Sequence, residues 1–212
     1  MDKLIAQNLL QIKAIKLNPQ NPFTWASGMR SPIYCDNRIT LSHPPVRSLI
    51  KKALADIVPE FGEITMISGV ATAGIAHGAL LADYLNLPFS YVRAAPKSHG
   101  RQNQIEGEIQ SGDRILVIED LISTGGSSLE VVEILEEHDF EVAGVLAIFD
   151  YGFEKAKQNF MKSACKYRSL SNYKVLVEEA QSTQYISNEE ALILQAWSED
   201  PQNWYQKYYD LS

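Results

Sequence analysis

Residues 114–128, with the sequence RILVIEDLISTGGSS, contain the pattern that decides the fold. The stretch begins with a run of branched apolar residues, reaches two acids at Glu119 and Asp120, and then passes a glycine pair at Gly125 and Gly126. An apolar run followed by a glycine turn and a helical pattern predicts a strand that is buried on both faces. Strand, turn and helix in this order are typical of a parallel sheet covered by helices.

The segments on both sides of this stretch alternate between strand and helix patterns. Short apolar runs predict further buried strands at residues 64–70, 89–92 and 142–149. Helical patterns predict helices at residues 46–58, 73–85, 127–137, 155–163 and 188–199, and a first helix from the N-terminus to about Lys16. The predicted fold is therefore α/β, with a doubly wound, mainly parallel sheet flanked by helices and a small N-terminal cap.

Composition and charge limit the classes of function. The chain has 212 residues, is 45% hydrophobic and carries a net charge of −7. An acidic chain argues against binding to nucleic acid or to an anionic membrane as the main role. Two distant cysteines, Cys35 and Cys165, favour a reducing compartment. We see no signal peptide and no run near the roughly 18 apolar residues of a membrane span, so we expect a cytoplasmic protein.

The loop after the two acids has the composition of a phosphate-binding turn. Gly125 and Gly126 allow positive φ, and the backbone N–H groups of residues 123–127 can converge on one point beside a helix N-terminus. Glu119 and Asp120 would repel a phosphate, but carboxylates accept hydrogen bonds from vicinal hydroxyls. A ribose 5-phosphate has a diol at one end and a phosphate at the other. The alternative is a solvated acidic turn in which Ser127 is the N-cap of the helix.

A second unusual segment lies between the strands predicted at residues 89–92 and from residue 114. About 20 residues with few apolar side chains connect them, which is long for a compact domain. Arg93, Lys97, His99 and Arg101 make this loop cationic within an acidic chain. These charges suit a functional lid, and the alternative is a disordered loop without a role.

Residues 117–128, VIEDLISTGGSS, resemble the phosphoribosyl pyrophosphate (PRPP) signature of type I phosphoribosyltransferases. The resemblance implies that this segment binds PRPP, with the acids on the ribose diol and the loop on the 5-phosphate. The residues to which it assigns PRPP binding are Glu119, Asp120, Leu121, Ile122, Ser123, Thr124, Gly125, Gly126 and Ser127.

Residues 27–38, SGMRSPIYCDNR, resemble the hood that covers the base in orotate phosphoribosyltransferases. Tyr34 and Cys35 fall where that family contacts orotate, and Ser123 is implied to touch orotate as well. The alternative is that Tyr34 only packs the hood onto the rest of the domain. If the hood has its family role, the acceptor is a flat, anionic pyrimidine.

Two more segments match that family. Arg93, Lys97 and His99 fit the R-x-x-x-K-x-H-G core of its catalytic lid, which closes over the diphosphate in the neighbouring subunit. The resemblance therefore implies a homodimer. Residues 69–74, GVATAG, match the diphosphate loop, which implies PRPP contacts at Thr72 and Ala73.

The sequence departs from the family at three cationic positions. Many members have lysine where this chain has Ala26, Ala73 and Ala94. More of the diphosphate charge is then left to the lid cations and to Mg²⁺. We hypothesise that Arg30 compensates for Ala26 and contacts orotate.

The resemblance implies transfer of the phosphoribosyl group from PRPP to orotate, with Lys97, His99 and Asp120 as catalytic residues. Mg²⁺ is expected to be held mainly by PRPP and water, without a direct protein ligand. Residues 1–45 would form the N-terminal helix and hood. Residues 46–212 would form the PRPP-binding core with its lid at residues 94–112, as a single structural unit. The alternatives are a phosphoribosyltransferase for another base and a PRPP sensor without catalysis.

Overall fold

A six-stranded sheet forms the centre of the computed structural model, which describes residues 1–93 and 104–209. The strands are β5 (Met66–Val70), β6 (Phe89–Val92), β7 (Ile105–Glu106), β8 (Arg114–Ile122), β9 (Glu141–Asp150) and β10 (Tyr167–Asn172). Their order across the sheet is β10-β9-β8-β5-β6-β7, and β7 alone runs antiparallel to its neighbour. The predicted α/β class and mainly parallel sheet are confirmed.

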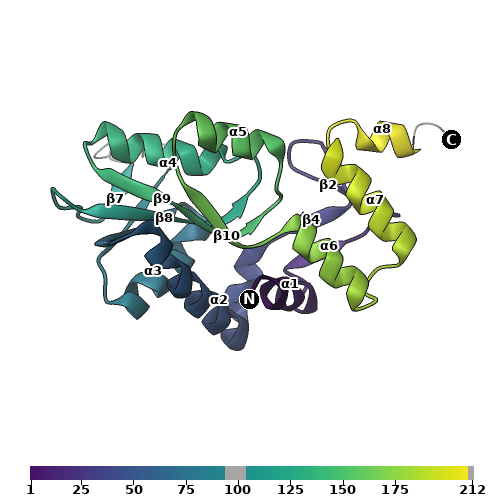
Figure 1. Ribbon diagram of the computed structural model, residues 1–212, viewed down its shortest axis with the longest axis horizontal. Coiled ribbons are helices and arrows are strands. Elements are labelled where there is room, and N and C mark those ends of the chain that lie inside the picture. The colour runs from purple at the N-terminus through teal and green to yellow at the C-terminus, as the bar shows by residue number, and fades with distance from the viewer. Residues whose placement is uncertain (94–103, 210–212) are drawn as a thin grey trace.

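Helices cover both faces of the sheet. They are α2 (Pro44–Ile57) and α3 (Ala73–Leu85) on one face, and α4 (Gly126–Glu137) and α5 (Glu154–Lys162) on the other (Figure 1). Along β8, Leu116 and Ile118 pack into the core beneath α2 and α3, whereas Ile115 and Val117 pack beneath α4 and α5. Because successive strand residues point to opposite faces, a strand covered on both sides is apolar throughout.

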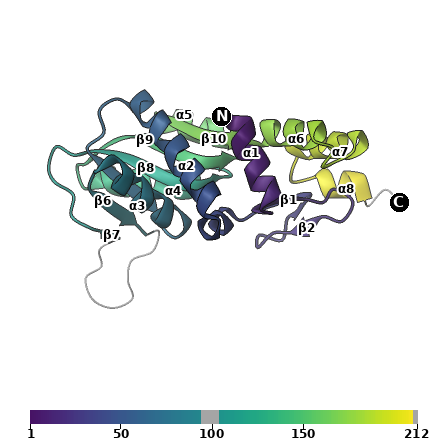
Figure 2. The ribbon, with the colours of Figure 1, turned by 90° about the horizontal axis from the view of Figure 1, so that it is seen from below.

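A smaller lobe lies beside the sheet and is built from both ends of the chain (Figures 1 and 2). Its N-terminal elements are α1 (Asp2–Gln11), β1 (Ile15–Leu17), β2 (Phe23–Thr24), β3 (Arg30–Ser31) and β4 (Ile33–Cys35). Its C-terminal elements are α6 (Tyr173–Ser182), α7 (Asn188–Glu199) and α8 (Trp204–Tyr209). The short 3-10 helices η1 (Asn37–Ser42) and η2 (Val58–Phe61) flank α2.

Aromatic packing joins the two ends of the chain within this lobe. Trp197 of α7 is fully buried, and its ring centroid lies 5.9 Å from that of Trp25 in the N-terminal segment. Trp204 is also buried, and the Tyr209 hydroxyl donates to the Pro19 carbonyl. The C-terminal tryptophans are therefore packing residues, whereas Tyr208 is exposed.

The structure corrects the predicted elements at the first helix and in the chain after α5. The first helix ends at Gln11, not near Lys16, because Lys13 adopts a positive φ of 59° and the chain continues as β1, which pairs with β4. The second correction is β10 with the following α6, which we did not predict. β10 is an edge strand of sequence YRSLSN, in which Leu170 is the one buried aliphatic side chain, so the strand lacks an apolar run.

The order of the strands reverses between β5 and β8, which creates a switch point in the sheet. The two strands pair in parallel from Met66 beside Ile115 to Gly69 beside Ile118, and β8 then continues beyond the end of β5. At this point α3 approaches β8 closely, because a Cβ on Gly74 would lie 2.3 Å from the Ile118 carbonyl oxygen. Ligands of such sheets bind at the carboxyl ends of the strands flanking a switch point.

Gly74→Ala should therefore destabilise the protein by about 1–3 kcal/mol, the usual cost of overpacking a tight contact. The added methyl group meets the backbone of β8, which cannot move aside as a flexible side chain could. Urea unfolding followed by circular dichroism measures the change. Asp83→Ala, on an exposed position of the same helix, should stay within about 0.5 kcal/mol of the wild type. Equal stabilities for both variants would contradict the close approach.

No helix among the described residues is both long enough and apolar enough to cross a membrane.

Candidate functional site

Glu119 and Asp120 lie within β8, where this strand extends past β5. The structure thus extends the strand beyond the apolar run and through both acids. Glu119 is only 4% exposed, and its Oε1 accepts a hydrogen bond from the Asp120 backbone N–H at 2.9 Å. Its Oε2 accepts from the hydroxyls of Ser127 and Ser128, each at 3.1 Å. Burial raises the pKa of the Glu119 carboxyl to about 8 and also raises the pKa of Asp120.

The predicted phosphate loop follows directly and has a fixed shape. Gly125 has a φ of +79°, and a Cβ there would lie 2.6 Å from the Phe160 ring, so this position requires glycine. The Asn159 side chain donates to the Thr124 carbonyl at 2.9 Å, which ties the loop to α5. Ser123 lies in the same loop and is half-buried.

The N-terminus of α4 is open at the end of this loop. The helix begins at Gly126, its N-cap is Gly125, and no side chain caps it. The alternative in which Ser127 is the N-cap is therefore wrong, because the Ser127 hydroxyl donates to Glu119 instead. Gly126 and Ser127 are exposed, so their first-turn N–H groups are available to a ligand. Such an N-terminus favours an anion, above all a phosphate.

The loop from β5 to α3 lies on the other side of the switch point. Thr72 is exposed and Ala73 half-buried, and the Ala71 N–H donates to the Val92 carbonyl at 2.9 Å. The peptide between Ala71 and Thr72 is cis. This predicted diphosphate loop thus lies at the carboxyl end of β5, beside the strand that carries the acids.

The hood, residues 27–38, reaches the same place. Burial, followed by the charge of Asp120, raises the pKa of the Cys35 thiol, which shows that Cys35 lies near this acid. The Asn37 side chain is fully buried and donates to the Asp120 carbonyl oxygen at 2.6 Å. Tyr34 is 39% exposed, with its ring 5.8 Å from that of Phe23. The structure therefore joins the predicted base segment to the acid pair.

Three residues near the acids were not assigned to the site from the sequence: Asn37, Arg38 and Tyr151. Arg38 pairs with Asp36 at 2.7 Å, which raises the pKa of Arg38 with a smaller contribution from Asp120. Tyr151 is buried, stacks on Trp25 at 5.3 Å, and has a pKa raised by burial and then by neighbours that include Cys35 and Asp120. The polar run directly after Cys35 could have indicated the first two, but nothing in the sequence marks Tyr151.

The remaining predicted residues divide between described and undescribed parts of the chain. Arg30 lies with its guanidinium 4.7 Å from the Tyr205 ring centroid, against α8. The Arg93 N–H donates to the Gln104 carbonyl at 2.9 Å, at the base of the predicted lid. Lys97 and His99 lie outside the described residues, as does Ala94. Part of the predicted lid is strand β7, which pairs with β6.

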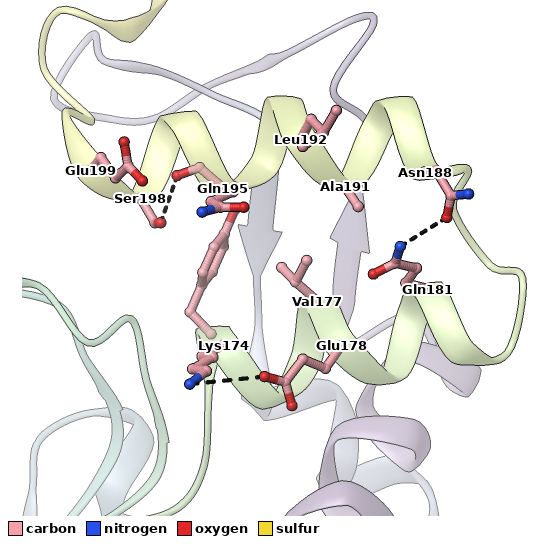
Figure 3. A pocket seen from close by; sticks show the side chains of 11 residues that line it. Lys174, Val177, Glu178, Gln181, Asn188, Ala191, Leu192, Gln195, Ser198 and Glu199 are labelled. Carbon is pink, nitrogen blue, oxygen red and sulfur yellow. Dashed lines mark hydrogen bonds and ion pairs between the residues drawn. The ribbon is translucent and has the colours of Figure 1, made fainter.

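A separate pocket of about 520 Å³ lies between α6 and α7 (Figure 3). Its polar side chains pair with each other, as Lys174 with Glu178 at 4.0 Å and Gln181 with Asn188 at 2.8 Å. No acid pair or open helix N-terminus lines it. The edge at the carboxyl ends of β5 and β8 is therefore the candidate site. Within residues 1–93 and 104–209, no group of three or more metal-binding side chains is present.

Known proteins are similar to this chain in fold and in sequence. The family model of the phosphoribosyl transferase domain matches residues 39–183. An orotate phosphoribosyltransferase of Porphyromonas gingivalis is 52% identical over 205 residues, covering 96% of this chain and 98% of the relative. One from Listeria monocytogenes is 51% identical with the same coverage. The crystal structure of orotate phosphoribosyltransferase from Aeropyrum pernix has a TM-score of 0.75 at 28% identity, covering 86% of this chain and 99% of that one.

These similarities define a phosphoribosyltransferase fold. The resemblance stated from the sequence is confirmed. The chain belongs to the orotate phosphoribosyltransferase family.

The buried state of Glu119 predicts a pH dependence of stability. Its pKa is about 8 in the folded protein and near its ordinary value of 4.5 in the unfolded chain. Between these values the folded state binds more protons, so this group's contribution to stability falls as pH rises. Relative to the wild type, Glu119→Gln should gain stability with rising pH from 5 to 8, by on the order of 1 kcal/mol per pH unit.

Urea unfolding at pH 5, 6.5 and 8 tests this expectation. The control is Glu133→Gln, an exposed change on α4 that also removes one carboxylate. If the Glu119→Gln and wild-type stabilities change in parallel with pH, the raised pKa of Glu119 is wrong.

Proposed function

We propose that this protein transfers the 5-phosphoribosyl group from PRPP to orotate, forming orotidine 5′-monophosphate and diphosphate in pyrimidine biosynthesis. One juxtaposition carries the proposal. The open N-terminus of α4 and the partly exposed Asp120 lie at the two ends of one short loop, at the switch point of the sheet. A sugar with a phosphate at one end and a diol at the other suits this pair of groups. Membership of the orotate phosphoribosyltransferase family supports the assignment of the acceptor.

The loop residues divide the recognition of PRPP between them. The backbone N–H groups of Gly126 and Ser127 would bind the 5-phosphate with help from Ser123 and Thr124, since an uncapped helix N-terminus attracts phosphate. The acid pair would receive the ribose hydroxyls as hydrogen-bond donors. Thr72 and Ala73, beside the acids, would meet the diphosphate through the backbone.

The reaction breaks the bond between the anomeric carbon and the diphosphate oxygen and the N–H bond of the orotate ring nitrogen. It forms a bond from the anomeric carbon to that nitrogen, and the proton leaves with the diphosphate or passes to water. The transition state resembles an oxocarbenium ion, as in glycosyl transfer. The protein contributes mainly position and electrostatics. Arg93, Lys97 and His99 would neutralise the leaving diphosphate, and closure of the lid would exclude water. In a homodimer this lid serves the neighbouring subunit.

The donor set fits a magnesium ion that is held mostly by substrate. Asp120 is a partly exposed carboxylate, whereas the oxygens of Glu119 already accept three hydrogen bonds. Mg²⁺ prefers oxygen ligands, keeps several waters and would supply positive charge beside the diphosphate. We therefore propose that PRPP and water provide most of its ligands.

The hood supports a flat, anionic base as acceptor. Tyr34 and Cys35 follow the β3 strand that carries Arg30, and Cys35 lies near Asp120. Orotate would then sit between the hood and the sugar. Both cysteines of the described chain are free, which suits the cytoplasmic location that completes this proposal.

Depletion of orotate, followed by its absorbance, tests the function directly. The purified protein with PRPP and Mg²⁺ should consume orotate, and a chelator should abolish the reaction. Activity with another base but not with orotate would show that this other base is the acceptor. Binding of PRPP in calorimetry without turnover of any base would make the protein a sensor.

Lys97→Ala should lower kcat by about 10²–10⁴, the range for a lost charge-stabilising or proton-transferring group. The KM for orotate should change much less, because the lid acts on the leaving diphosphate. Lys155→Ala, an exposed change on α5, is the matched control. Near-normal turnover in the Lys97 variant would refute the role of the lid.

A further inference from the structure

Glu119 links three parts of the site through its two carboxylate oxygens. One oxygen accepts from the backbone N–H of Asp120, and the other accepts from the hydroxyls of Ser127 and Ser128. The side chain is almost fully buried. A carboxylate offers about four acceptor sites, so three of those of Glu119 are already used inside the protein.

The two acids differ in burial and in hydrogen-bond partners, although their carboxyl groups lie close enough to interact with each other. Successive residues of a strand alternate between its faces. Ile115 and Val117 pack on the side of α4, and Glu119 continues this set toward the serines of that helix. Asp120 lies on the side of the hood, near Cys35. It is also less buried than Glu119.

Ser128 links the first turn of α4 to Glu119, on the other side of the phosphate loop. It is fully buried in the first turn of α4, and its hydroxyl donates to Glu119 across nine residues of sequence. Ser127 makes the same contact from the neighbouring position. These hydrogen bonds fix the open end of α4 relative to Asp120. The phosphate-binding N–H groups and the sugar-binding carboxylate are thereby held at one spacing.

We propose that Glu119 is a positioning residue: it braces the N-terminus of α4 against β8, and Asp120 is the acid that meets the ribose hydroxyls. This inference rests on the proposed function and divides its acid pair into two roles. Glu119 then acts on PRPP through Ser127 and Ser128. Its loss disturbs the loop without removing a contact to the sugar.

A double-mutant cycle tests this brace. Ser128→Ala should raise the KM for PRPP about tenfold, as expected for a lost buried hydrogen bond, with little change in the KM for orotate. Glu119→Ala should lower kcat/KM for PRPP about 10²-fold. Because both changes break the same brace, the double variant should be within about threefold of Glu119→Ala. Losses that multiply would show that Glu119 contacts PRPP independently of Ser128 and would overturn the inference.

The conservative variant separates geometry from charge. The variants are compared at pH 9, above the pKa of Glu119, where the wild-type carboxyl is ionised. The amide of Glu119→Gln can accept from the Asp120 N–H and donate to the serine hydroxyls, so it keeps the brace while removing the charge. It should recover at least tenfold of the kcat/KM that Glu119→Ala loses. Equal losses in both variants would assign the effect to the carboxylate charge and overturn the brace. Asp120→Asn should show no such recovery relative to Asp120→Ala, and recovery there would place both acids in the same role.

Ser90→Ala is the matched control for the buried serine. Ser90 is equally buried, in β6, and its hydroxyl donates to Ser68 at 3.0 Å. It should lower the melting temperature without raising the KM for PRPP. If it raises that KM as Ser128→Ala does, the effect reflects general loosening and the brace is refuted. Failure of the wild type to bind PRPP would instead refute the proposed function, which keeps the two failures distinct.

Discussion

β5 and β8 pair in parallel, and the chain leaves their carboxyl ends toward opposite faces of the sheet. This arrangement fixes where every functional segment lies. The connection after β5 enters α3, whose Gly74 touches the backbone of β8, and the connection after β8 enters α4 through Gly125. The loop after β5 and the loop after β8 therefore lie at the same edge of the sheet. The close packing depends on glycine at both positions, because a side chain on Gly74 would meet the backbone of β8 and one on Gly125 would meet the Phe160 ring of α5.

The neighbouring acids show that two adjacent carboxyl groups can have different environments. Glu119 is surrounded by hydrogen-bond donors and apolar side chains beneath α4. Asp120 meets the hood, where the buried Asn37 holds its carbonyl oxygen. A carboxylate whose oxygens already accept hydrogen bonds from the protein holds those donors in place, whereas a carboxylate with free acceptor sites can bind a ligand. The internal hydrogen bonds of Glu119 thus separate its supporting role from recognition by its neighbour Asp120.

Much of the fold followed from local pattern, since the central strands are continuous apolar runs and the glycine turn precedes a helix. The edge strand β10 escaped prediction because one side of it has no neighbour and its sequence is largely polar. In the site, Glu119 and the loop were evident from adjacent residues. The contact from Asn37 to Asp120 spans 83 positions, and Tyr151 reaches Trp25 only through tertiary packing. No periodicity within a segment encodes such contacts, which explains why they were missed.

The packing of N-terminal against C-terminal segments in the smaller lobe has a consequence for folding during translation. The sheet and its phosphate turn are complete once β10 has been synthesised. The N-terminal segment, however, packs on residues made later, since Trp25 contacts Trp197 and the Pro19 carbonyl accepts a hydrogen bond from the Tyr209 hydroxyl. The ribosome must release the final helix before the hood can obtain this support. A chain that stops some 30 residues early would therefore form the sugar-phosphate turn, but its hood would lack the packing that α7 and α8 provide.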